Sequence, residues 1–255
     1  MDVETFRLLI AAVHAAATDD NVKAAVLTGT GKFFSTGADV APNLGITGAL
    51  YYLAGRLGHY LASELRDTSV ALTSACLSFP KPLICALNGP VVGWSAAVLG
   101  CFDIVIVAES ATLATPFMDL GLVPEGLSSV TFPQVLGPSL ANDVLVFGRK
   151  ITAQEMLACG FASRVLPDAG FQDAVHGLLA SSTLTSSLGS LTGAKRLLRP
   201  RQEVAALEKV NHFELKVIGD RFKSGDPVKK FQEKAAALRT KKREKKGAAA
   251  MKSKL

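Results

Sequence analysis

A long stretch without a charged side chain, Leu83 to Phe102, is the feature that most limits what this chain can fold into. It has the roughly 20 residues that a membrane-spanning helix needs. Asn88-Gly89-Pro90, however, is turn chemistry that would break such a helix near its start, and it leaves Leu83 to Leu87 as a short apolar run. Strands covered on both faces of a parallel sheet have this composition. We therefore predict a buried α/β core and no membrane span.

Helical and strand patterns alternate along the first half of the chain, as a parallel sheet with crossover helices requires. Past Gly121 the pattern is mostly helical. Thr152 and Glu155 form a capping box, and Gly160 lies where the helix that follows them would end. We interpret Arg164-Val165-Leu166 as a short apolar link. The expected elements are a helix at Val3 to Ala17, a strand at Lys23 to Thr28, a helix within Gly48 to Phe79, strands at Leu83 to Leu87 and Ile104 to Ala108 with a short helix at Trp94 to Gly100 between them, a helix at Ala153 to Cys159, and further helices from Phe171 to Leu238.

The formal net charge of +6 resides in the segment Lys241 to Leu255. The rest of the chain therefore has no net basic field that would attract nucleic acid. Because the segment is rich in lysine and alanine, we expect a flexible tail. The predicted organisation is a core over residues 1–200, a C-terminal helical region over 201–238 and a basic tail over 239–255.

Three further features limit the class of protein: the start of the chain, its cysteines and its histidines. No leader typical of secretion precedes Asp2. The four cysteines lack CxxC spacing and lie in apolar stretches, so we expect reduced core residues. The four histidines lack metal-ligand spacing, and we predict no metal site.

Ser253-Lys254-Leu255 has the form of a peroxisomal address at a carboxyl end. It predicts delivery to the peroxisome matrix by an import receptor. A solvated lysine-rich tail or a nuclear-type basic cluster is the alternative reading of the same residues.

Two segments resemble the two sequence signatures of the crotonase family. The first is the loop Phe34-Ser35-Thr36-Gly37-Ala38-Asp39, and the second runs from Asn88-Gly89-Pro90 to Ala97, followed by Cys101-Phe102-Asp103-Ile104. Their order and separation also fit, and the resemblance covers roughly residues 3 to 220. It implies an α/β fold, the ββα superhelix, with a helical C-terminal region that forms a trimer. The first two strands of that superhelix are not found ahead of the helix at Val3, so we expect a core without them.

The resemblance also implies a ligand, a CoA thioester, whose carbonyl oxygen accepts hydrogen bonds from two backbone N–H groups. Carried over to this chain, the donors are those of Ala38 and Trp94. Preorganised donors of this kind are worth about 3–4 kcal/mol each. The substrate-binding residues implied are Thr36, Gly37, Ala38, Asp39, Val40 and Trp94. Two glycine turns without a ligand are the alternative reading.

Carboxylates decide which reaction of the family is expected. The two positions at which its hydratases carry glutamates are Ala97 and Phe117 here, which disfavours water addition. Glu125, in Leu122-Val123-Pro124-Glu125-Gly126, instead matches the single catalytic glutamate of peroxisomal Δ3,Δ2-enoyl-CoA isomerases. Enclosure by Leu122, Val123 and Leu127 is expected to raise the pKa of its carboxyl group. The alternative is a surface glutamate in the first turn of a helix after Pro124.

The resemblance therefore implies an isomerase that converts 3-enoyl-CoA to trans-2-enoyl-CoA in β-oxidation of unsaturated fatty acids. Glu125 would move the proton without any cofactor, in a homotrimer or hexamer. One alternative is a dienoyl-CoA isomerase, with Asp119 as a second acid, although turn residues around Asp119 favour a structural role. The other is a catalytically silent subunit that assembles with an intact relative.

Overall fold

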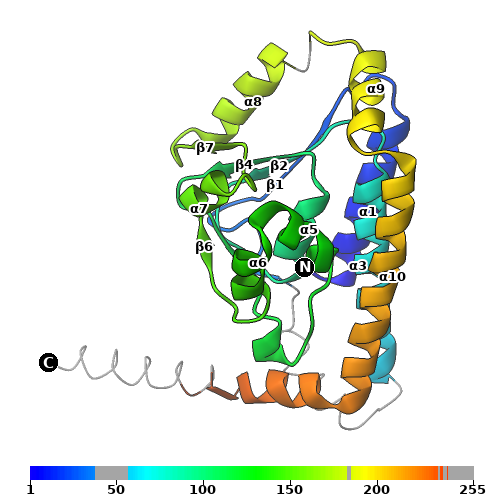
Figure 1. Ribbon diagram of the computed structural model, residues 1–255, viewed down its shortest axis with the longest axis vertical. Coiled ribbons are helices and arrows are strands. Elements are labelled where there is room, and N and C mark those ends of the chain that lie inside the picture. The colour runs from blue at the N-terminus through cyan, green and yellow to red at the C-terminus, as the bar shows by residue number, and fades with distance from the viewer. Residues whose placement is uncertain (38–56, 183–184, 235, 238–239, 241–255) are drawn as a thin grey trace, which may run out of the picture.

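The structure is a computed structural model, and the residues that it describes are 1–37, 57–182, 185–234, 236–237 and 240 (Figure 1). Strands and helices alternate through its first half, as predicted. The elements in chain order are α1 Val3–Thr18, β1 Ala25–Thr28, α3 Leu57–Ser78, β2 Leu83–Leu87, β3 Val91–Val92, α4 Trp94–Ala97, the 3-10 turn η1 Val98–Cys101, β4 Ile104–Ala108, β5 Thr112–Ala114, the 3-10 turn η2 Met118–Leu120, α5 Ser128–Leu136, α6 Pro138–Leu145, β6 Ile151–Thr152, α7 Ala153–Ala158, β7 Arg164–Leu166, α8 Phe171–Ser182, α9 Leu188–Leu198 and α10 Arg201–Ser224.

Two sheets carry these strands. The larger has the order β1-β2-β4-β7 with every pair parallel, and the smaller has the order β3-β5-β6. In the larger sheet Ile84 of β2 lies between Val26 of β1 and Ile104 of β4. All five residues of β2 are buried, as its uninterrupted apolar run predicts. The α/β core expected from the sequence is therefore confirmed.

The interpretation of Arg164-Val165-Leu166 as a link is wrong. These residues form β7, which pairs in parallel with β4 through Ile106 opposite Arg164. Three residues are too few to show a period-two pattern, so the sequence gives no strand signal. The position of β4 beside this segment is what makes it a strand.

The uncharged stretch from Leu83 to Phe102 consists of β2, a turn, β3, α4 and η1 rather than one helix. In the described part of the chain, no helix combines the length and the apolar character that crossing a membrane requires. The expected helix at Trp94 to Gly100 is divided into α4 and the 3-10 turn that follows it. The capping box of Thr152 and Glu155 is present at the start of α7.

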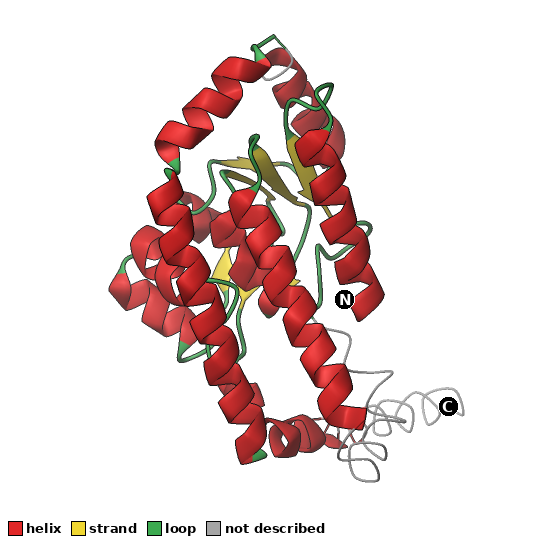
Figure 2. Ribbon diagram, turned by 90° about the vertical axis from the view of Figure 1, so that its right-hand side faces the viewer, coloured by secondary structure: helices red, strands yellow, loops and turns green. Residues whose placement is uncertain are grey.

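Helices α1, α3 and α10 pack along one side of the molecule, with α3 in contact with both of the others (Figures 1 and 2). Phe6 of α1 and Leu207 of α10 belong to the same hydrophobic core as Leu83, Cys85 and Leu87 of β2. Among the side chains most completely enclosed there are Phe117 and Phe132. The C-terminal helices are thus built into the core that surrounds the sheet.

An ion pair of the buried Lys195 fixes α9 against the sheet. Nζ of Lys195 donates to Oδ2 of Asp103 at 2.7 Å and to the carbonyl oxygen of Lys81 at 2.8 Å. The same Oδ2 accepts from the N–H of Leu83, the first residue of β2. Pairing of this kind is what allows a lysine to remain buried.

The four cysteines are free thiols, as expected. Three are buried, and burial raises the pKa of the Cys76 thiol to about 12. These side chains pack as small apolar groups.

Candidate active site

The two segments that resemble family signatures lie side by side. Ser35 forms a parallel β-bridge with Val91, and its carbonyl oxygen accepts from the N–H of Val92 at 3.0 Å. Gly37 and Gly93 both have positive φ, at 91° and 72°. A Cβ atom added to Gly93 would lie 3.9 Å from the Cα atom of Gly37. Glycine is therefore used at both places for conformation, and its small size keeps the backbones close.

Asn88 joins the second segment to the turn that precedes the first. Its Oδ1 accepts from the N–H of Gly29 at 2.9 Å, and its Nδ2 donates to the carbonyl oxygen of Gly31 at the same distance. Ser35 and Ser95 also share a hydrogen bond of 2.9 Å between their hydroxyl groups. Polar side chains thus set the separation of the two segments.

Trp94, one of the two predicted donors, is the first residue of α4. Its N–H belongs to the first turn, where amide groups have no partner within the helix. The indole ring packs edge-on against Phe6, with the ring centroids 4.8 Å apart. The other predicted donor, Ala38, lies outside the described residues, as do Asp39 and Val40. Thr36 and Gly37 are described, and Gly37 is buried next to Val92.

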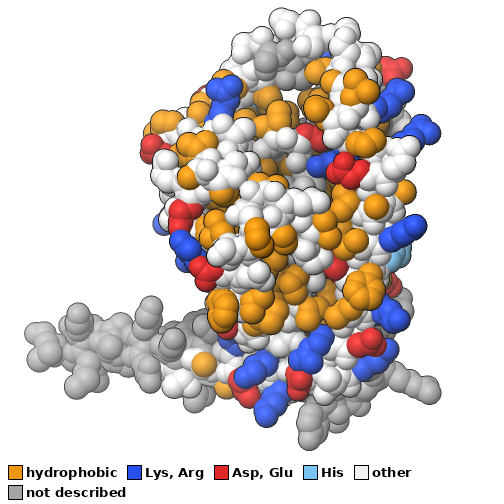
Figure 3. All heavy atoms as spheres, in the orientation of Figure 1, with side chains coloured by type: hydrophobic (Ala, Val, Ile, Leu, Met, Phe, Trp, Pro, Cys, Tyr) orange, Lys and Arg blue, Asp and Glu red, His pale blue; other side chains and the backbone are white. Residues whose placement is uncertain are grey.

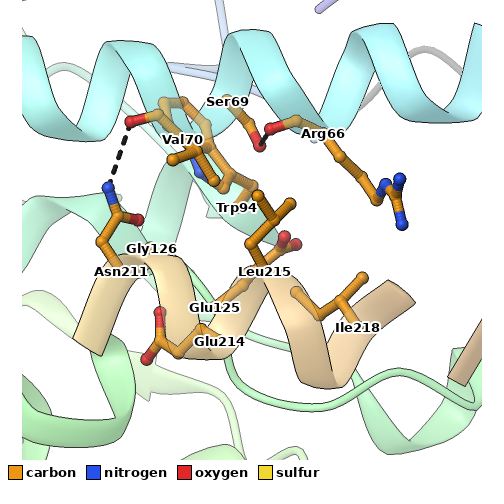
Figure 4. Close-up of a pocket in the computed structure, with 10 residues that line it drawn as sticks. All are labelled: Arg66, Ser69, Val70, Trp94, Glu125, Gly126, Asn211, Glu214, Leu215 and Ile218. Atoms are coloured by element: carbon orange, nitrogen blue, oxygen red, sulfur yellow. Dashed lines mark hydrogen bonds between the residues drawn. The ribbon is translucent and has the colours of Figure 1, made fainter. Parts of the chain in front are cut away.

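A small pocket, partly open to solvent, lies between α3, α10 and the start of α4 (Figure 4). Its walls combine apolar side chains with three charged ones. Amide Nδ2 of Asn211 crosses from α10 to the carbonyl oxygen of Val70 on α3, at 3.1 Å. The lining residues are Arg66, Ser69, Val70, Trp94, Glu125, Gly126, Asn211, Glu214, Leu215 and Ile218.

Glu125 lies in this pocket, half-buried. Burial raises the pKa of its carboxyl group to about 8, and the negative charge of Glu214 contributes to the increase. The raised pKa was predicted, but the contribution of Glu214 was not. The alternative position in the first turn of a helix is wrong, because α5 begins only at Ser128. Ser128 bonds back to the carbonyl oxygen of Glu125 through its N–H and its hydroxyl group.

Glu214 is the residue of this site that sequence reasoning missed. It lies on α10 and is 5% exposed. Burial raises the pKa of its carboxyl group, while hydrogen bonds from Ser129 and Leu127 lower it in part. A sequence signal existed: the buried stripe of α10 is Leu207, Asn211, Glu214 and Ile218, at helical spacing. Two polar residues on an otherwise apolar stripe mark a site where buried groups need partners.

Asp119 lies apart from the pocket. It belongs to η2, and its side chain is 74% exposed, with Nζ of Lys234 3.9 Å from its Oδ2. Ala97 and Phe117, at the positions of the hydratase glutamates, are both buried in the core. Glu125 and Glu214 are therefore the carboxylates that line the described pocket. Among the described residues no group of three His, Cys, Asp or Glu side chains is arranged to hold a metal ion.

The raised pKa of Glu125 predicts how the stability of the protein depends on pH. Between about pH 4.5 and pH 8 the folded state keeps a proton that the unfolded state has lost, so the free energy of unfolding falls as pH rises through this window. In Glu125→Gln this group no longer titrates, so this decrease in the free energy of unfolding is absent. The stability of the variant relative to the parent should therefore increase from pH 5 to pH 9, measured by urea denaturation. Glu203→Gln, at an exposed position of α10, is the control, and a constant difference for Glu125→Gln would contradict the prediction.

Comparison with known proteins identifies the family to which the chain belongs. The family model described as enoyl-CoA hydratase/isomerase matches residues 1–239. Enoyl-CoA delta isomerase 2 of Homo sapiens is 34% identical over 226 residues, which is 89% of this chain and 55% of that protein. Delta(3,5)-Delta(2,4)-dienoyl-CoA isomerase of Pyricularia oryzae is 36% identical over 248 residues, covering 91% of this chain and 86% of that protein.

Two further comparisons bear on location and fold. The peroxisomal enoyl-CoA delta isomerase 3 of Mus musculus is 34% identical over 173 residues, which is 67% of this chain and 52% of that protein. The crystal structure of an enoyl-CoA hydratase/isomerase from Pseudoalteromonas atlantica superposes with a TM-score of 0.74 at 26% identity, over 92% of this chain and 88% of that chain. The chain thus spans about half the length of the two enoyl-CoA delta isomerases, and most of the dienoyl-CoA isomerase and of the solved structure. It belongs to the enoyl-CoA hydratase/isomerase family, the crotonase family.

Proposed function

We propose that this chain isomerises 3-enoyl-CoA to trans-2-enoyl-CoA in the β-oxidation of unsaturated fatty acids. The observation that carries the proposal is the half-buried carboxyl group of Glu125, in a pocket that also contains Trp94, with its pKa raised to about 8. A carboxyl group with this pKa can take up a proton and return it near neutral pH. The names of the human and mouse relatives support the same activity.

In the proposed reaction, the carboxylate of Glu125 removes a proton from C2 of the acyl chain. The C2–H electron pair delocalises onto the thioester oxygen, which accepts a hydrogen bond from the backbone N–H of Trp94. The second N–H, that of Ala38, is assigned by family resemblance. When this negative charge moves back from the oxygen into the carbon chain, a double bond forms between C2 and C3. The π electrons of the original C3–C4 double bond then take up the proton from Glu125 at C4. Glu125 ends as it began, so the cycle needs no redox cofactor.

A dienoyl-CoA isomerase is the second candidate, because the Pyricularia oryzae relative has that name. The two-acid scheme requires a second carboxyl group at the substrate. Asp119, the residue expected to supply it, is exposed to solvent away from the described pocket. We therefore favour the single-glutamate reaction.

The remaining proposals concern assembly and location. We propose an acyl-CoA substrate, a homotrimer or hexamer that uses the helical region 201–238, and import into the peroxisome through Ser253-Lys254-Leu255. Hydrophobic side chains gather on the face that carries α5 and α6 (Figure 3), and Phe147, just after α6, is 82% exposed. An exposed patch of this kind is compatible with contact between subunits. The mouse relative, named peroxisomal, supports the location.

Three substrates offered to the purified chain distinguish the candidate functions. With cis-3-octenoyl-CoA we expect the absorbance of a conjugated 2-enoyl thioester to appear. With a 3,5-dienoyl-CoA or with crotonyl-CoA in water we expect little or no turnover. Conversion of the diene alone would support the dienoyl-CoA isomerase. Binding of octanoyl-CoA without turnover of any substrate would support a catalytically silent subunit.

A further inference from the structure

We propose that Glu214 on α10 is a positioning residue of this site: its carboxylate fixes the loop that carries Glu125 and places a second negative charge beside it. This inference deepens the proposed function and rests on Glu125 being the base. It concerns a residue that comes from the C-terminal helix, 89 positions further along the chain than Glu125. Three observations support it.

The first observation is a set of hydrogen bonds to the loop. Oε2 of Glu214 accepts from the N–H of Leu127 at 2.8 Å, and Oε1 accepts from the N–H and the hydroxyl group of Ser129 at 3.3 and 2.5 Å. Leu127 and Ser129 are two and four residues after Glu125. The carboxylate of Glu214, which belongs to α10, therefore holds the backbone that follows Glu125 in the chain.

The second observation is the conformation of the loop. Leu127 has a φ of 66°, and among the described residues it is the one non-glycine residue with a positive φ. A left-handed conformation is unfavourable for such a residue because its Cβ atom approaches the following carbonyl oxygen. Its side chain is fully buried, and its N–H is the donor to Oε2 of Glu214. Removing the Glu214 carboxylate thus releases a turn whose conformation is unfavourable on its own.

The third observation is the distribution of charge. The charged side chains that line the pocket are Arg66 from α3, Glu125 from the loop and Glu214 from α10, while α4 and α5 contribute none. Glu208, further back on α10, is bonded to the Ser74 hydroxyl group of α3. Of these groups, it is Glu214 whose charge raises the pKa of Glu125. A like charge keeps a proton on its neighbour to higher pH.

The same contacts argue against Glu214 as a second acid. Its two oxygens already accept three hydrogen bonds, and a carboxylate has about four acceptor sites in total. To carry a proton to a substrate it would have to give up the bonds that hold the loop. We therefore assign it an effect through Glu125 and not direct contact with reacting atoms.

The test compares kcat, KM and the pH profile of the parent with those of Glu214→Gln. In the parent, kcat/KM for cis-3-octenoyl-CoA should rise with pH and reach half its maximum near pH 8, because the base must be ionised. Glu214→Gln removes the charge, so the half-maximum should move to lower pH, and kcat should fall about 10- to 100-fold because the loop is displaced. Glu203→Gln, exposed on the same helix, should change neither.

Glu214→Asp separates position from charge. It keeps the negative charge but shortens the side chain, so kcat should fall while the pH of half-maximal kcat/KM stays close to that of the parent. If Glu214→Gln does not fold, an unchanged kcat in Glu214→Asp would overturn the proposal. So would an unmoved pH profile in a folded Glu214→Gln, or a loss of turnover in it as complete as in Glu125→Gln.

A readout without turnover distinguishes failure of this inference from failure of the proposed function. The effect of Glu125→Gln on the free energy of unfolding is measured at pH 5 and pH 9, once in the parent and once in Glu214→Gln. The change with pH should be smaller in Glu214→Gln, since Glu125 then loses its proton at lower pH. An equal change in both backgrounds would overturn the inference even if the parent showed no isomerase activity.

Discussion

Glu125→Gln should reduce kcat for cis-3-octenoyl-CoA by about a thousandfold or more. A positioned acid or base contributes about 10²- to 10⁴-fold, and the amide can neither remove the proton from C2 nor return it at C4. KM should change little, because the amide has nearly the same shape and the contacts with Trp94 remain. The measurement is steady-state formation of the conjugated product.

Asp119→Asn is the matched control for this loss. The carboxyl group of Asp119 is exposed and does not line the described pocket, so kcat should stay within about twofold of the parent. If Glu125→Gln kept its activity, the base would be another group. If Asp119→Asn lost its activity instead, the two-acid reaction of the dienoyl-CoA isomerases would become the better proposal.

Gly89→Ala should have the second largest effect, through the backbone. A Cβ atom at this position would lie 2.2 Å from the carbonyl oxygen and 3.1 Å from the carbonyl carbon of Lys32. Both are backbone atoms, which cannot turn aside as a flexible side chain can. The loop that continues from Lys32 to Ser35 and Gly37 must therefore shift away from Val92 and Trp94. A displacement of about 1 Å in an active site can cost about 100-fold in rate, and we expect at least that loss of kcat/KM.

Overpacking of this kind also costs about 1–3 kcal/mol of stability, occasionally more. Gly177→Ala is the control, because Gly177 is an exposed interior residue of α8 with open space where the Cβ would lie. That change should raise the free energy of unfolding by about 0.5–1 kcal/mol, since glycine is the poorer helix former. Urea denaturation and kcat/KM measured on both variants check the prediction. Gly89→Ala with normal stability and activity would mean that the two segments are not held as closely as described.

The elements predicted best are those whose local pattern is long or specific. β2 and β4 have the predicted bounds, and α1 and β1 differ from prediction by one or two residues. The capping box at Thr152 was readable because its two partners are three residues apart. β7 was missed because its few residues carry no period and become a strand only through pairing with β4.

Within the candidate site, the sequence by itself determined which groups could act. Glu125 and Trp94 could be named because motifs of fixed order surround them, and a motif keeps its local backbone geometry wherever the fold places it. The sequence predicted that burial raises the pKa of the Glu125 carboxyl group, and the direction of that shift is confirmed. Ala38 stays a prediction that lies outside the described residues.

The tertiary structure alone decided what stands next to Glu125. Periodicity shows that a face of α10 is buried, but not which distant residue that face meets, because such contacts depend on how the helices pack and not on the spacing of residues within one of them. Packing of α10 against α3 brings Glu214 to the Glu125 loop, and the position of η2 leaves Asp119 at the surface. The charge that acts on the candidate base is therefore a property of the folded molecule and not of any segment of its sequence.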